Sequence, residues 1–152
     1  MRIVRTGLRC SFAVAIMCTA AVAAPADAAA RVFLPICGNS AYGGRVEPSS
    51  WDAGCTGQLE LIRAAWTGWG RDVAVAHGFT PWFVCDPDCA SGTRYEFRAR
   101  LRVSRVRTCR GKSGRYRRFY THARLRYRVP PDHPKGIPPG LRVRRFRLVC
   151  IR

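Results

Sequence analysis

Apolar and polar residues alternate most clearly in the C-terminal half of the chain. Over residues 94–103, and again over residues 118–129, nearly every second residue is apolar and the residues between are mostly arginine. This period of two is typical of strands that bury one face. We expect Tyr120 and His122 on the arginine-bearing face. The apolar sets are Tyr95, Phe97, Ala99, Leu101 and Val103 in the first segment, and Phe119, Ala123, Leu125, Tyr127 and Val129 in the second.

A third alternating segment begins at Leu141. Its phase breaks where Arg144 and Arg145 are adjacent, and a β-bulge there would restore the register and leave Phe146, Leu148 and Cys150 in the apolar phase. Turn signals separate the three segments: Gly-Lys-Ser-Gly at residues 111–114, and five of the ten prolines at residues 130–140. Because proline has no N–H for a strand ladder, we expect a hairpin turn at the first position and a loop at the second.

Extended segments are also expected in the N-terminal half, at residues 58–66, 72–77 and 81–85. In the first of these, the alternation places Leu59, Leu61 and Arg63 on one face and Glu60, Ile62 and Ala64 on the other. No segment has a convincing helical pattern. Short strands joined by turns predict an all-β domain, either a small disulfide-stabilised β-sandwich or a small β-barrel.

Residues 1–28 have the pattern of a secretory signal peptide. Arg2, Arg5 and Arg9 precede or begin an uncharged apolar stretch at residues 11–24, and Ala-Asp-Ala at residues 26–28 offers a cleavage site. The stretch is too short for a transmembrane helix, which needs about 20 residues. We therefore expect a secreted or cell-wall-associated protein with one domain at residues 29–152.

Export also decides the cysteine chemistry. Loss of residues 1–28 leaves six of the eight cysteines, an even number that predicts disulfides in an oxidising compartment. Six cysteines allow fifteen pairings, and connectivity cannot be deduced from the sequence. Two thiols and two carboxylates lie within residues 85–89, but structural zinc favours closer cysteine spacing and exported thiols oxidise, so we expect no metal site. The predicted disulfide cysteines are Cys37, Cys55, Cys85, Cys89, Cys109 and Cys150.

Charge is concentrated in the C-terminal half. Residues 29–93 hold four arginines and six acids, whereas residues 94–152 hold 18 arginines and two lysines against Glu96 and Asp132. Such a field attracts polyanions. Strand alternation places arginines in two rows, and we predict a polyanion-binding surface made of Arg98, Arg100, Arg102, Arg118, Arg124, Arg126 and Arg128. The alternative is a solvated basic face that reflects arginine-rich codon usage, since the chain has 25 arginines and two lysines.

Trp66 and Trp69 lie in the segment Trp-Thr-Gly-Trp-Gly, and residues 85–92 read Cys-Asp-Pro-Asp-Cys-Ala-Ser-Gly. With Cys55 and Cys109, these motifs resemble a family of small secreted actinobacterial proteins for which no activity is established. The resemblance covers roughly residues 50–125 and implies export and a compact disulfide-bonded fold. Cys37 and Cys150 are additions to the family pattern, and we expect them to pair with each other.

Little in the sequence indicates catalysis. His77, His122 and His133 are scattered, and no serine or free cysteine has the context of a nucleophile. Gly-Lys-Ser at residues 111–113 lacks the earlier glycine of a phosphate-binding loop. No cofactor is expected.

Three functions remain open. The first is non-enzymatic binding of anionic cell-envelope polymers by the arginines. The second is a secreted structural or interaction module that recognises a protein or carbohydrate through Trp66, Trp69 and its loops, although large aromatics in a small domain usually belong to the core. The third, which fewer features favour, is a small hydrolase.

Overall fold

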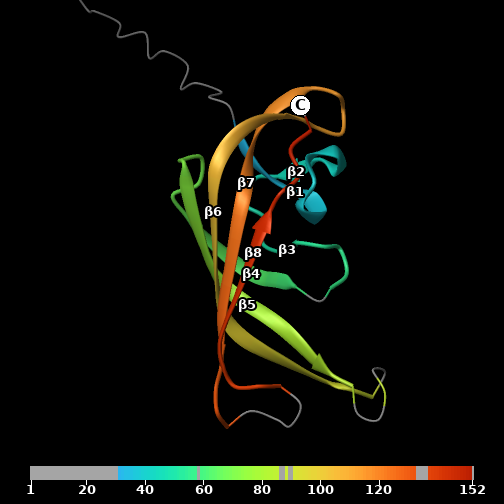
Figure 1. The fold of residues 1–152 in the computed structure, drawn as a ribbon, viewed down its shortest axis with the longest axis vertical. Helices are drawn as coiled ribbons and strands as arrows, with labels where there is room; N and C mark the ends of the chain where they lie inside the picture. Colours follow the sequence, from blue (N-terminus) through green and yellow to red (C-terminus); the bar gives the residue numbers. More distant parts are fainter. Residues whose placement is uncertain (1–30, 58, 86–87, 89–90, 133–136, 152) are drawn as a thin grey trace, which may run out of the picture.

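Strands make up most of the part of the chain that the structure describes, as the alternating pattern predicts (Figure 1). The computed structural model describes residues 31–57, 59–85, 88, 91–132 and 137–151. The predicted signal peptide at residues 1–28 lies outside these ranges. The longer strands are β4 (Glu60–Thr67), β5 (Val73–Val84), β6 (Thr93–Arg110), β7 (Tyr116–Val129) and β8 (Gly140–Arg147). The shorter elements are β1 (Val32–Pro35), β2 (Gly44–Arg45), β3 (Trp51–Asp52) and two 3-10 helices, η1 (Ile36–Gly38) and η2 (Ser40–Tyr42). The all-β class is confirmed.

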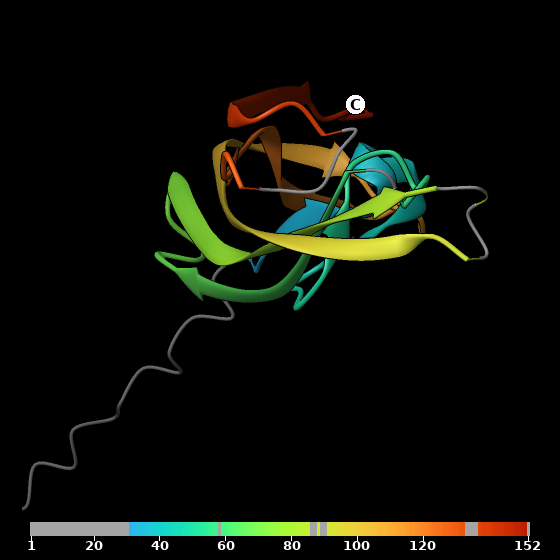
Figure 2. The ribbon, with the colours of Figure 1, turned by 90° about the horizontal axis from the view of Figure 1, so that it is seen from below.

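These strands form one sheet in the order β2-β1-β7-β6-β5-β4-β3, and β8 pairs with β7 beside this path. β1 and β8 share one edge of β7: β1 runs parallel to residues 118–119, and β8 runs antiparallel to residues 122–129. Seen along its long axis, the sheet curls around its own interior (Figure 2). This half-barrel is nearer to the barrel alternative than to the two stacked sheets of a sandwich.

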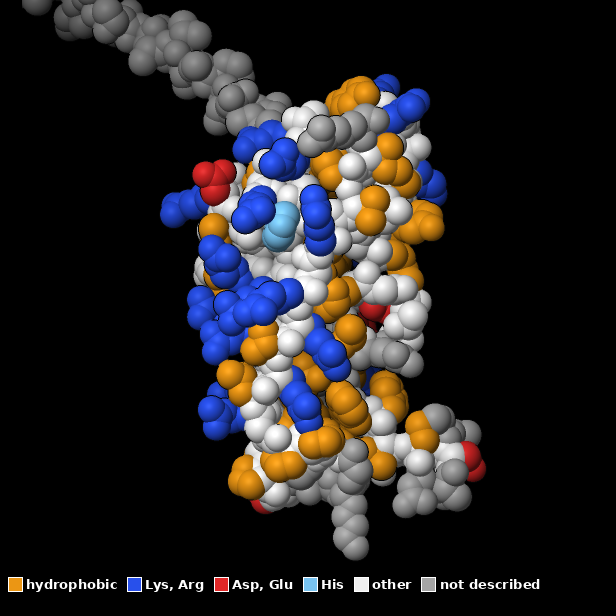
Figure 3. All heavy atoms as spheres, viewed as in Figure 1, with side chains coloured by type: hydrophobic (Ala, Val, Ile, Leu, Met, Phe, Trp, Pro, Cys, Tyr) orange, Lys and Arg blue, Asp and Glu red, His pale blue; other side chains and the backbone are white. Residues whose placement is uncertain are grey.

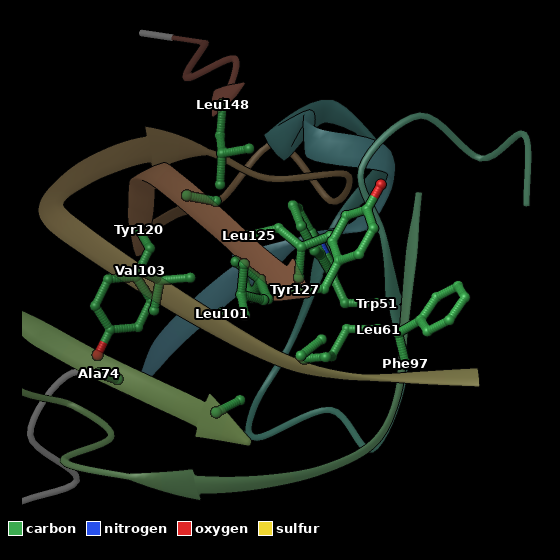
Figure 4. Packing of buried hydrophobic residues seen from close by; sticks show 14 of the residues in the cluster. Trp51, Leu61, Ala74, Phe97, Leu101, Val103, Tyr120, Leu125, Tyr127 and Leu148 are labelled. Carbon is green, nitrogen blue, oxygen red and sulfur yellow. The ribbon is translucent and has the colours of Figure 1, made fainter. Parts of the chain in front are cut away.

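The concave side of the sheet holds the core, and the central strands fill it with the residues that alternation predicts (Figure 4). Trp51 of β3 packs at one side of this core. Its Nε1 donates a hydrogen bond to the Pro35 carbonyl at 2.9 Å, and its ring contacts Phe146 edge-on. Each large apolar side chain buried here stabilises the fold by about 1.5 to 3 kcal/mol. The central strands contribute Phe97, Ala99, Leu101 and Val103 from β6 and Ala123, Leu125, Tyr127 and Val129 from β7.

The inward face changes phase in β6 and β7 at the same level of their ladder. Val103 and Ala123 pair with each other and both face the core, as do the odd-numbered residues before them in the ladder. Beyond this level the even-numbered pair Val106 and Tyr120 packs into the core instead. The register of β6 against β7 is the same before and after this level. The face that points to the core therefore changes in both strands at once, and we call this level the phase switch.

Arg105 and Thr121 occupy the level at which the phase changes. Arg105 has a φ of 60°, a left-handed conformation that is strained for a residue with a side chain. Thr121 is buried, and its Oγ1 donates a hydrogen bond of 2.7 Å to the Arg105 carbonyl. This side-chain bond replaces a regular ladder contact and stabilises the switch.

Tyr120 is therefore a core residue, and its predicted place on the arginine-bearing face is wrong. Its side chain is fully buried. The hydroxyl donates to the Arg71 carbonyl at 2.9 Å and accepts from the Gly70 N–H at 3.1 Å. Burial raises the pKa of the Tyr120 hydroxyl, so it stays protonated as a donor. Phe119 takes the opposite side of β7 and packs against Phe33 with ring centroids 5.7 Å apart.

β4 departs from the predicted alternation at a bulge. Its register against β5 shifts after Ile62, and Arg63 has a φ of 51°. Leu61 is buried, but after the bulge Ala64 also packs against the core, so the prediction that placed the two residues on opposite faces is wrong. A Cβ on Gly78 of β5 would lie 2.5 Å from the Ile62 carbonyl oxygen, so the close approach of the two backbones requires glycine.

The two extended segments expected at residues 72–77 and 81–85 are largely parts of one strand, β5. Its small residues Ala74 and Ala76 face the core, whereas Val73 is exposed. A curled sheet brings the residues on its concave side close together. Small residues on β5 therefore leave room there for the longer side chains of β6 and β7.

β8 pairs with β7 in one unbroken register, so the predicted bulge at Arg144 and Arg145 is wrong. Arg145 lies opposite Arg124, and Arg144 lies opposite the buried Leu125. Arg144 nevertheless stays exposed, and it lines a pocket of about 580 Å³ together with Trp82 and Phe83 of β5. The expected hairpin turn and loop do lie at the β6–β7 and β7–β8 connections, although residues 133–136 are outside the described ranges.

Two disulfides join described cysteines, Cys37 to Cys55 and Cys109 to Cys150, with Cα–Cα distances of 5.0 and 5.2 Å. The expected pairing of Cys37 with Cys150 is wrong. The two ends of the domain do meet, since the Val149 N–H donates to the Gly38 carbonyl at 2.7 Å.

The C-terminal segment also runs beside the end of β6, and the Arg110 N–H donates to the Ile151 carbonyl at 2.6 Å. This contact brings Cys150 to Cys109 rather than to Cys37. Cys85 is disulfide-bonded too, and the predicted disulfide residue Cys89 lies outside the described residues.

Candidate anion-binding surface

Six of the predicted arginines form two rows on adjacent strands. Arg100 stands opposite Arg126, and Arg102 stands opposite Arg124. These positions alternate with the buried residues of β6 and β7, so the guanidinium groups lie on the convex side of the sheet. We call this surface the arginine face and define it as Arg98, Arg100, Arg102, Arg124, Arg126 and Arg128. Figure 3 shows basic side chains gathered over these strands.

The neighbouring strands extend the arginine face. Arg145 of β8 pairs with Arg124, and His77 of β5 pairs with Arg100. Neither was predicted as a site residue: the alternation of β8 had suggested a bulge at Arg145, and His77 was assigned to a strand end. A shallow hollow of about 220 Å³ lies toward the Arg98 and Arg128 end of the face. Its lining includes His77, Arg98, Arg100, Arg126, Arg128 and Leu141.

Acidic groups do not balance this charge in the described part of the chain. Among the residues that form strands β5, β6, β7 and β8, Glu96 is the one acidic residue. Its carboxylate forms ion pairs with Arg63 and, at 3.3 Å, with Arg94. No arginine of the arginine face takes part in an ion pair with a described residue. The Nε of Arg124 is buried without a hydrogen-bond partner among the described residues, which leaves a strong donor unused.

Arg118 does not belong to the arginine face, although the sequence pattern placed it there. Arg118 and Tyr120 are two residues apart on β7 and share one side of the strand. Because Tyr120 packs into the core below the phase switch, Arg118 is directed to that side, where its charge acts on the Tyr120 hydroxyl. The row of basic side chains predicted on β7 therefore ends at His122 and not at Arg118.

His122 lies at the end of the arginine face, in a pocket of about 560 Å³. The imidazole Nε2 is 3.4 Å from Nη1 of Arg105, and Nδ1 is 3.1 Å from Oγ1 of Thr121. Burial lowers the pKa of His122, and the charges of Arg105, Arg147 and Arg107 lower it further. The pocket is lined by Arg105, Arg107, Thr121, His122, Arg147, Leu148, Val149 and Cys150.

Hydrogen-bond roles in this pocket follow from the donors. Arg105 can only donate, so Nε2 of His122 accepts from it. The Thr121 hydroxyl gives its proton to the Arg105 carbonyl and can accept from Nδ1–H. His122 is thus neutral, with its proton on Nδ1. This arrangement differs from that of a hydrolase, where the hydroxyl would give its proton to the imidazole.

Trp66 and Trp69 are packed against the core and against each other, with ring centroids 4.6 Å apart. Their indole N–H groups donate to backbone carbonyls within the fold, Trp66 to Pro48 at 2.8 Å and Trp69 to Val32 at 3.1 Å. Trp69 also meets Tyr120 edge-on. These contacts hold both half-buried tryptophans in the fold and use their indole N–H groups within it.

Comparison with known proteins adds no relative. No protein-family model, no curated protein and no solved structure matches the chain. None of the helices in the described ranges is long and apolar enough to cross a membrane. The family resemblance carried by the tryptophan and cysteine motifs stays a prediction.

Proposed function

We propose that this protein is a secreted, non-enzymatic binder of anionic cell-envelope polymers and that the arginine face is its binding surface. The observation that carries the proposal is the pairing of Arg100 with Arg126 and of Arg102 with Arg124 on one exposed sheet face. Like charges placed opposite each other across a ladder destabilise the strand pair. A polyanion would neutralise this repulsion on binding.

A polymer fits the arginine face better than a small anion does. Alternate residues of a strand lie about 7 Å apart, and facing residues of paired strands about 5 Å apart. The six guanidinium groups therefore form a double row on the convex surface of the sheet rather than a closed site. The hollow on this face is shallow, which suits the repeating charges of an extended chain. The expected signal peptide would deliver the protein to a compartment that contains such polymers.

Retention on immobilised heparin tests the proposal. The face variant Arg100→Gln/Arg126→Gln should elute at clearly lower salt than the wild type. The control variant Arg45→Gln/Arg115→Gln removes the same net charge from exposed positions outside the face, on β2 and in the β6–β7 turn. Equal losses in both variants would show that only net charge matters, and the proposed surface would be wrong.

A further inference from the structure

We propose that the pocket around His122 is a separate binding site for a phosphate monoester group. It uses Arg105 and Arg107 of β6, Thr121 and His122 of β7, and Arg147 of β8. None of these residues belongs to the arginine face. The inference therefore goes beyond polymer binding, and its test does not depend on whether the arginine face binds a polymer.

The walls of the pocket are held in place by covalent and backbone contacts. Cys150, which lines it, is bonded to Cys109 at the end of β6. The Leu148 N–H donates to the Thr121 carbonyl at 2.8 Å, so the chain continues alongside β7 after β8 ends. The neighbouring Val149 N–H donates to the Gly38 carbonyl at 2.7 Å. A site built on such fixed elements loses little entropy when a ligand binds.

Strained backbone places Arg105 beside the imidazole. Its positive φ lies at the phase switch, where the Thr121 hydroxyl holds its carbonyl. In a regular strand, Arg105 and Arg107 would share one side of β6. At the switch, the Arg105 guanidinium instead reaches Nε2 of His122. Arg147 reaches the same pocket because it pairs with His122 in the β7–β8 ladder, so three cationic side chains and one imidazole converge there.

The donor set matches a phosphate monoester more closely than other anions. Three guanidinium groups surround the pocket, and no carboxylate is among its lining residues. A phosphate monoester carries a charge of about −1.5 to −2 at neutral pH and three acceptor oxygens. A carboxylate or a phosphodiester carries a single charge and two free oxygens. Planar guanidinium groups bind phosphate oxygens in pairs, so three of them suit the more highly charged group.

Room for the rest of a ligand is also present. At about 560 Å³, the pocket is larger than a phosphate group needs, and it is open to solvent on one side. Arg105 now donates to Nε2, but it would turn to a bound phosphate. Nε2 could then take up a proton and donate to the ligand as well. The pocket therefore has room for more of a ligand than its phosphate group.

Nuclear magnetic resonance of the imidazole of His122 tests the inference. The oxidised mature protein is titrated at pH 7 and constant ionic strength with glycerol phosphate, dimethyl phosphate and acetate in separate experiments. Glycerol phosphate should shift the His122 signals saturably and bind at least tenfold more tightly than the other two. Equal binding of all three probes, or no saturable shift with glycerol phosphate, would overturn the proposed site.

Matched variants locate the binding. Arg107→Gln/Arg147→Gln should weaken glycerol phosphate binding at least tenfold, whereas Arg98→Gln/Arg128→Gln, which removes the same charge from the arginine face, should leave it within twofold. Backbone spectra of both variants report whether they fold. If the pocket variant is misfolded, Arg147→Lys replaces it and should weaken binding, because lysine keeps the charge but loses the paired donors. Equal weakening by pocket and face variants would overturn the inference.

Discussion

Arg102 of β6 stands directly opposite Arg124 of β7, and Arg145 of β8 follows on the other side of Arg124. Three guanidinium groups thus cross one level of the sheet without an acid between them. Such a row lowers the stability of the free protein, because like charges opposed on a ladder repel. A surface with this cost is expected where an anionic partner binds.

Arg126→Glu should stabilise the free protein while weakening polyanion binding. The new carboxylate would face Arg100 across the ladder and convert a repulsive pair into an attractive one. Pairs of this kind contribute roughly 0.2 to 1 kcal/mol. The free energy of unfolding, measured by urea denaturation in low salt, should rise by about that amount. Arg115→Glu in the turn is the control, and an equal gain there would assign the effect to net charge alone.

Tyr120→Phe should destabilise the fold by about 0.5 to 1.5 kcal/mol for each hydrogen bond lost, because it removes the hydroxyl that bonds the Arg71 carbonyl and the Gly70 N–H. Tyr116→Phe is the matched control, since Tyr116 is 63% exposed and should tolerate the change. Urea denaturation measures both. A loss below 0.5 kcal/mol for Tyr120→Phe, on the scale of an ordinary surface substitution, would mean that this hydroxyl does not tie β7 to the turn after Trp69.

Removal of the Cys109–Cys150 disulfide in Cys109→Ala/Cys150→Ala should cost about 2 to 4 kcal/mol. This bond closes a separation of 41 residues, against 18 for Cys37–Cys55, so its loss should cost more than that of the shorter loop. Chemical denaturation of the two double variants gives the comparison. Peptide mapping of the unreduced protein should recover both pairs, and a Cys37–Cys150 peptide would contradict the described connectivity.

His122 should make the stability depend on pH on the acidic side of neutrality. Its pKa is lowered in the folded state from 6.5, so below that pH the unfolded chain binds a proton more readily than the folded protein does. The free energy of unfolding should therefore fall as the pH drops from above 6.5 to the lowered pKa, and His122 should add no pH dependence above or below that window.

His122→Gln supplies the comparison for this pH effect, because it should flatten the acidic side of the stability profile. The groups that face the imidazole are Arg105, Arg107 and Arg147, all positive, and the neutral Thr121. A proton titration of His122 with a midpoint above 6.5 would contradict both the lowered pKa and the neutral tautomer.

Much of this architecture can be predicted from alternation alone. The apolar positions of β6 and the outward arginines of β6 and β7 follow from a period of two that persists over many residues. The hairpin turn at residues 111–114 follows from its glycines. These features are local, so a single stretch of sequence contains the information that specifies them.

Features set by contacts between distant strands could not be predicted in this way. Tyr120 changes sides because both β6 and β7 turn over at Arg105 and Thr121, and nothing in the sequence of β7 alone marks that level. The bulge at Arg63 arises opposite Gly78 on another strand. The disulfide pairs depend on the path of the C-terminal segment past both η1 and β6. The His122 pocket requires residues from three strands to converge.

The most direct test of the central claim is the salt dependence of binding to a single-stranded phosphodiester polymer, with oligothymidylate as the probe. The logarithm of the binding constant should fall linearly with the logarithm of salt concentration, and Arg100→Gln/Arg126→Gln should reduce the slope by about 0.7 for each arginine that contacts a phosphate. Arg45→Gln/Arg115→Gln should leave the slope unchanged. Binding that does not respond to salt, or a slope that is the same in the wild type and the face variant, would contradict the account.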